Sequence, residues 1–158
     1  MQLDPRTILI LWATINLMFA AMLALIGRHS DQIRGAKQWA WGDLLIGLSF
    51  ALSSQVTNPP SFHIVLLASI GIGTGFGLLY NGIEAFRGKP CSYWVPAFLS
   101  VAMFTNNYVF AILENEPWLR ILINFVLFAG LHIACALCSS KSKHLCAPLI
   151  GWLAYRSR

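Results

Sequence analysis

Five stretches of about twenty mostly apolar residues fill most of this 158-residue chain. A helix that crosses a bilayer needs about 20 such residues, and each stretch here holds at most one charged side chain. We therefore predict an all-α fold, a polytopic membrane helix bundle in which residues 1–158 form a single transmembrane domain. The five predicted transmembrane helices are residues 7–27, 38–56, 63–86, 93–113 and 117–138.

A sixth apolar run, residues 145–155, has only about half the length of a span. It contains Pro148 and Gly151 and is followed by two arginines. Two interpretations stay open, a short interfacial helix and a truncated sixth span. The first apolar stretch is longer than the roughly 7–15 residues of a signal peptide, so we expect it to remain in the mature protein.

The composition excludes several classes of protein. Hydrophobic residues make up 57% of the chain and charged residues 11%, whereas soluble domains have roughly 45–50% and about 25%. The chain therefore lacks the charge to cover a water-facing surface, which argues against a soluble enzyme and a disordered tail. Taken alone, a formal net charge of +5 suggests a nucleic-acid partner, but the basic residues lie in short loops between apolar runs. We expect the bilayer, not nucleic acid, to be the partner.

The basic residues also predict an orientation, because cytoplasmic loops are enriched in Lys and Arg. The loops after the first, third and fifth stretches hold seven basic residues, while the opposite side has only Arg6 and Arg120. We predict a multi-pass protein of the bacterial inner membrane, with its N-terminus outside and its C-terminus in the cytoplasm. The seven residues are Arg28, Arg34, Lys37, Arg87, Lys89, Lys141 and Lys143.

A glycine run in the third stretch is the densest local signal. Gly71 with Gly75, and Gly73 with Gly77, each form a small-xxx-small pair, which allows another helix to approach closely in lipid. We interpret the run as a helix-packing surface within the bundle, with a homodimer contact as the alternative.

Polar side chains inside the spans form a second signal. A polar group that faces hydrocarbon costs several kcal/mol without a partner, so these groups must face one another, water or a ligand. We predict either hydrogen bonds between helices or a ligand pocket open to the outer side. The candidate ligand-binding residues are Asn16, Asn106, Asn107, Asn124 and Arg120.

Acids and cysteines lie toward the predicted inner side. Glu84 and Arg87 are three residues apart and are expected to pair on one helix face. His132, Cys135 and Cys138 have ligand chemistry that suits zinc or copper, but their spacing spreads them around one helix. We therefore predict no metal and no cofactor, and keep these three as weak candidates. No catalytic residues and no nucleophile–base pattern are found, so we predict no enzymatic activity.

Two segments resemble one known group of proteins. The segment QWAWGDLLIG at 38–47 and the segment GLLYNGIEAFRGKP at 77–90 are similar to the multi-helix N-terminal membrane input regions of bacterial GGDEF-type diguanylate cyclases. The resemblance extends over residues 7–140. The Gly-Gly-Asp/Glu-Glu-Phe signature of their catalytic domain is absent from these 158 residues. The resemblance therefore implies a sensing or anchoring module of cyclic-di-GMP signalling that is separated from its output domain, or a truncated gene.

The predicted function is a non-catalytic membrane sensor or anchor that transmits a ligand or membrane signal to a cytoplasmic partner. A protein partner or a second copy of the chain within the membrane is expected. The alternative is an accessory subunit of a larger membrane complex. A third reading is a small dimeric transporter with Glu84 or Asp43 as its coupling acid.

Overall fold

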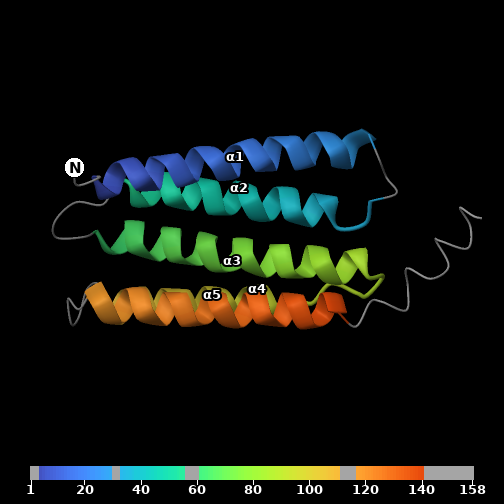
Figure 1. The fold of residues 1–158 in the computed structure, drawn as a ribbon. Helices are drawn as coiled ribbons and strands as arrows, with labels where there is room; N and C mark the ends of the chain where they lie inside the picture. Colours follow the sequence, from blue (N-terminus) through green and yellow to red (C-terminus); the bar gives the residue numbers. More distant parts are fainter. Residues whose placement is uncertain (1–3, 30–32, 56–60, 111–116, 141–158) are drawn as a thin grey trace, which may run out of the picture.

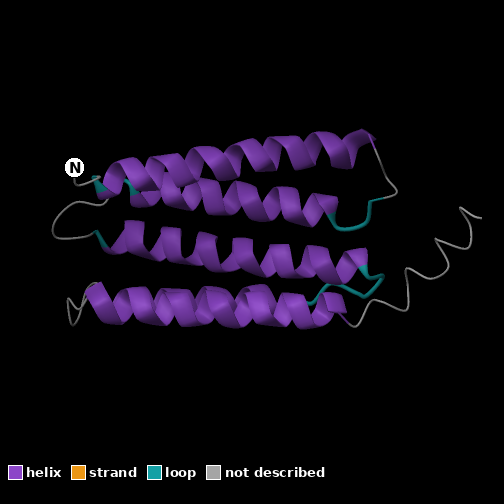
Figure 2. Ribbon diagram, in the orientation of Figure 1, coloured by secondary structure: helices purple, strands orange, loops and turns teal. Residues whose placement is uncertain are grey.

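The computed structural model describes residues 4–29, 33–55, 61–110 and 117–140, and this part of the chain is helical and contains no strand (Figure 2). The all-α fold is confirmed, and each of the five predicted stretches contains one helix. Residues 145–155 lie outside the described residues. The helices are α1 (Pro5–His29), α2 (Ala36–Ser53), α3 (Phe62–Phe86), α4 (Trp94–Tyr108) and α5 (Pro117–Ser140).

The helices run up and down beside one another in a single bundle (Figure 1). From α1 to α4 each helix packs against the next one in the chain, and α5 contacts α3 and α4. Short connections between neighbours produce this antiparallel arrangement. The bundle therefore has two ends. We call the end where α1, α3 and α5 begin the cavity end, and the end where α2 and α4 begin the basic end.

Local residue choices set where the helices begin and end. Asp4 precedes α1, and its carboxylate accepts a hydrogen bond from the backbone N–H of Arg6 at 3.2 Å, as an N-cap residue does. At the basic end, Gly35 and Gly88 have φ angles of 96° and 76°, which favour glycine. Gly35 precedes α2, and a Cβ there would also collide with the backbone carbonyl oxygen of Gly82. The backbone at Gly35 therefore lies directly against the last turns of α3.

Small residues dominate the interior of the bundle. The largest fully buried side chains are Ile46 and Met103, while many contacts between helices involve glycine, alanine or serine. A Cβ on Gly42 would lie 2.8 Å from the carbonyl oxygen of Gly75, so the backbones of α2 and α3 nearly touch. Close backbone approach of this kind is typical of helices that pack in lipid.

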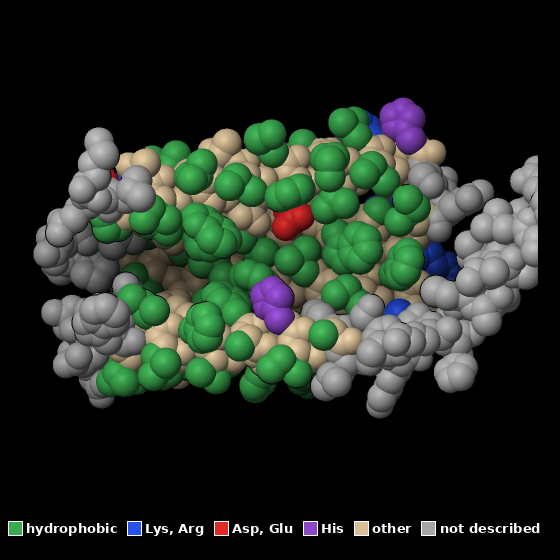
Figure 3. Space-filling model, in the orientation of Figure 1, with side chains coloured by type: hydrophobic (Ala, Val, Ile, Leu, Met, Phe, Trp, Pro, Cys, Tyr) green, Lys and Arg blue, Asp and Glu red, His purple; other side chains and the backbone are tan. Residues whose placement is uncertain are grey.

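Two of the described helices, α1 and α3, are long and apolar enough to cross a membrane. The described parts of the other three helices do not meet that criterion. Helix α2 has 18 residues and carries Lys37 and Asp43, α4 has 15 residues, and the described apolar segment of α5 is Ile121–Ile133. Figure 3 shows that hydrophobic side chains cover most of the visible face, and that Lys and Arg lie near one end.

Candidate functional site

A cavity of about 530 Å³ opens at the cavity end of the bundle, and all five helices contribute to its wall. Small-molecule pockets of proteins usually measure about 300–1,000 Å³, so this one has the volume for a small organic ligand. Most of its wall is apolar. The larger apolar side chains are Leu9, Phe50, Ile64, Val65, Ile72, Met103, Ile121 and Phe128.

One polar element of the wall joins α3 and α4. The side-chain amide of Asn107 donates a hydrogen bond to the Ser69 hydroxyl, with an Nδ2–Oγ distance of 3.0 Å. The Ser69 hydroxyl in turn donates to the backbone carbonyl of Val65 at 2.6 Å. Ser69 is buried, so the amide of Asn107 is held in place by a hydroxyl whose own direction is fixed.

A second polar element joins α4 and α5. Asn106 Nδ2 donates to Asn124 Oδ1 at 2.7 Å, and Asn124 lines the cavity whereas Asn106 is buried behind it. Asn106 and Asn107 are adjacent in α4. Helix α4 therefore carries the cavity amide of Asn107 itself and, through Asn106, orients the cavity amide of Asn124. Both amides are fixed in one wall of the cavity.

Asn107 and Asn124 both line the cavity, and each amide has hydrogen-bonding capacity that the bonds described above do not use. Within the described residues, Asn107 Oδ1 and Asn124 Nδ2 have no protein partner. One is an acceptor and the other a donor. The cavity therefore presents one acceptor and one donor above a largely apolar wall, which suits a small amphiphilic molecule with an uncharged polar group. Ser53 and Ser54 at the end of α2, and Asp4 and Arg6 at the start of α1, add further polar lining.

The structure brings three of the five predicted site residues together. The structure brings Asn107 and Asn124 into one cavity and places Asn106 in contact with Asn124. Asn16 lies elsewhere on α1 and donates to the backbone carbonyl of Trp12 at 2.8 Å, so its own helix satisfies it. Arg120 lies in the first turn of α5, and its side chain is outside the described part.

The four glycines of the run at 71–77 pack against two different helices. Gly71 and Gly75 face α2, where a Cβ would meet Ser49 and Ile46 respectively. Gly73 and Gly77 face α4, and a Cβ on Gly73 would lie 2.5 Å from Ser100 Cα. Both faces of the run are therefore occupied within the chain. The second pair sets how closely α4 approaches α3, and thus how Asn107 reaches Ser69.

Residues at the basic end form a separate polar cluster. Glu84 pairs with Arg87 at 2.9 Å and with Lys89 at 3.2 Å, which confirms the predicted Glu84–Arg87 contact. Asn81, which sequence reasoning missed, is buried and bonds both backbone groups of Ser92, at 2.8 Å and 3.2 Å. It closes the connection between α3 and α4. Its partner is backbone, which no side-chain pattern reveals.

The weak metal candidates do not form a site in the described part of the chain. The ring of His132 is exposed and its Nδ1 lies 2.7 Å from the backbone carbonyl of Phe128. The side chains of Cys135 and Cys138 lie outside the described part. Among the described residues no group of three His, Cys, Asp or Glu side chains converges.

The cavity and the polar cluster are the features that a relative of known function would have to share. Comparison of the chain with protein-family models, with curated proteins and with solved structures gives no match.

Proposed function

We propose that the chain is a non-catalytic sensor module of a bacterial inner membrane, in which all five helices cross the bilayer. The cavity binds a small amphiphilic ligand from the outer side. Binding changes how the helices pack, and a protein partner at the basic end receives the change. The observation that carries this proposal is the pair of fixed amides, Asn107 and Asn124, in a largely apolar cavity.

The exposed surface supports a membrane location. Large apolar side chains point outward along α1, such as Met18 at 69% exposure and Leu25 at 58%, and on α5 Phe125 is 69% exposed. Soluble monomers rarely expose apolar patches beyond a few hundred Å², whereas lipid accepts such a surface. Outside α5, the described basic residues lie mostly at one end of the bundle. This distribution is typical of a membrane protein, whose cytoplasmic loops are enriched in Lys and Arg.

The length of α3 allows a change at the cavity to reach the basic end of the bundle. This helix carries Ser69 at the cavity and Glu84 at the basic end, and its glycines contact α2 and α4 in between. A ligand that favours one spacing of α3 and α4 therefore biases both ends of one rigid element. The resemblance of residues 38–47 and 77–90 to diguanylate cyclase input regions supports a sensing role.

A thermal-shift experiment tests the cavity. The protein, purified in an uncharged detergent, is screened against medium-chain alcohols and primary amides. For any compound that raises the melting temperature, Asn107→Ala and Asn124→Ala should each weaken binding by about tenfold, since each removes one hydrogen bond of about 1.5 kcal/mol. Asn16→Ala is the matched control and should bind like the wild type. A compound whose binding is reduced by neither cavity variant contradicts the proposal.

An accessory subunit of a larger complex is the second candidate, and one feature favours it. An apolar groove of about 520 Å³ lies along α3, α4 and α5, lined by Trp94, Phe98 and Leu127 among others. A Cβ built on Gly130 in this groove has nothing within 4 Å, so a helix of another protein has room to approach. Stoichiometric co-purification of other membrane proteins, without any ligand effect, would favour this reading over the sensor.

A further inference from the structure

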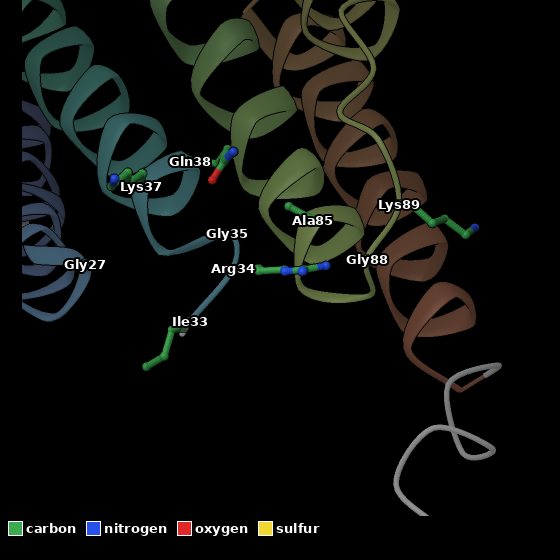
Figure 4. A pocket seen from close by; sticks show the side chains of 9 residues that line it. All are labelled: Gly27, Ile33, Arg34, Gly35, Lys37, Gln38, Ala85, Gly88 and Lys89. Atoms are coloured by element: carbon green, nitrogen blue, oxygen red, sulfur yellow. The ribbon is translucent and has the colours of Figure 1, made fainter. Parts of the chain in front are cut away.

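A second pocket, of about 320 Å³, lies at the basic end, where residues 33–35, which precede α2, lie beside the end of α3 (Figure 4). Much of its wall is backbone, because Gly27, Gly35, Ala85 and Gly88 contribute almost no side chain. The few functional groups that do line it therefore decide what it binds.

Those groups are cationic. Arg34 and Lys37 line the pocket, and no carboxylate of the described residues lies within ion-pair distance of either. Figure 4 shows the Arg34 side chain extending toward Gly88, and the Lys37 side chain extending toward α1. The third cation of the lining, Lys89, differs because it pairs with Glu84 at 3.2 Å. Arg34 and Lys37 thus provide positive charge that the described residues do not neutralise.

We propose that this pocket binds a phosphate-bearing anion. Arginine presents a planar fork of donors that matches phosphate oxygens, and lysine supplies a compact positive charge. Among the described residues the lining contains no acid. Gln38 also lines the pocket, and its Nε2 donates to Cys91 Sγ at 3.6 Å. The ligand is either the head group of an anionic lipid or a soluble phosphate compound. This proposal does not depend on the cavity at the opposite end.

The place of the pocket at the end of the bundle also favours a phosphate-bearing anion. Basic pockets between helices at a membrane surface hold anionic lipid head groups, and this pocket lies where α1 and α3 end, with Gly27 and Ala85 in its wall. Gly35 and Gly88 both need positive φ angles, and Gly35 contacts Gly82. The pocket is therefore built by two fixed turns rather than by long side chains, and the cations project from a defined frame.

Two binding measurements on the full chain in an uncharged detergent test the proposal and separate the sources. Native mass spectrometry counts bound phosphatidylglycerol against phosphatidylcholine, and tryptophan fluorescence follows a titration with pyrophosphate. The wild type should prefer phosphatidylglycerol, which assigns a lipid, or bind pyrophosphate, which assigns a soluble anion. The double variant Arg34→Gln/Lys37→Gln should lose about tenfold in affinity or more, since each basic group contributes about 1 kcal/mol toward an anionic head group.

The control is Arg28→Gln, which removes an arginine of the same end that does not line the pocket and should change affinity by less than about twofold. If the double variant fails to fold, as judged by circular dichroism, Ala85→Glu places a carboxylate in the wall and should also reduce binding. The proposal is overturned if the wild type binds neither probe. It is equally overturned if a folded pocket variant binds like the wild type, or if Arg28→Gln loses as much.

Discussion

Replacing Gly73 by alanine should lower the free energy of unfolding by about 1–3 kcal/mol, the usual cost of overpacking a tight contact. The new Cβ would lie 2.5 Å from Ser100 Cα, 2.6 Å from Ser100 N and 2.7 Å from the Leu99 carbonyl carbon. All three are backbone atoms, so no rotamer change relieves the clash and α4 must move away from α3. Unfolding in a denaturing detergent, followed by circular dichroism, measures the loss.

Gly130→Ala is the matched control for this substitution. A Cβ at Gly130 has nothing within 4 Å, so only the helix preference of alanine over glycine remains, which stabilises by up to about 1 kcal/mol. The two variants should therefore shift in opposite directions. Equal shifts would show that α3 and α4 do not pack as closely as described. Because α4 also carries Asn107, Gly73→Ala should weaken any ligand that binds in the cavity.

Replacing Glu84 by glutamine should cost about 3 kcal/mol, the low end of the range for removing one partner of a buried ion pair. Glu84 and Arg87 side chains are each only 11% exposed. Glutamine keeps the size of the side chain and removes its charge, so the Arg87 guanidinium stays buried without its counter-charge. The same unfolding measurement detects the loss, and adding Arg87→Gln to Glu84→Gln should restore part of it.

Lys89→Gln is the control for Glu84. Lys89 bonds the same carboxylate, but its side chain is 52% exposed, and exposed ion pairs contribute about 0–1 kcal/mol. If Glu84→Gln leaves stability unchanged, the cluster at the basic end is not structural. A role of Glu84 in proton-coupled transport would then explain this buried acid better than a structural role does.

The helices were predictable because apolar runs separated by basic loops carry a strong local signal. The Glu84–Arg87 pair was predictable for the same reason, since three-residue spacing on a helix is a local property. The partners of the glycines were not predictable. Gly71 and Gly73 are two residues apart, so they lie on different sides of α3, and Gly71 meets α2 whereas Gly73 meets α4. That division depends on the register of α2 and α4 along α3, which the sequence of α3 alone does not contain.

The candidate cavity was predictable only in part. The amides of Asn107 and Asn124 had to find partners in an apolar setting, and they did so across helices. Asn16 carries the same side chain, but it bonds its own helix one turn back, a choice open to any helical asparagine. Ser69 was missed because a small hydroxyl in a helix usually satisfies itself in this way. Its second role, as acceptor for Asn107, exists only once α3 and α4 have packed.

The central claim is a bundle that spans the membrane with its cavity end outside, and cysteine labelling tests it most directly. The four native cysteines are replaced by serine, and single cysteines are introduced as Gln55→Cys at the cavity end and Tyr93→Cys at the basic end, both exposed positions. In spheroplasts, a membrane-impermeant maleimide should label Gln55→Cys, and should label Tyr93→Cys only after lysis. Labelling of both positions before lysis, or of neither, would contradict the account.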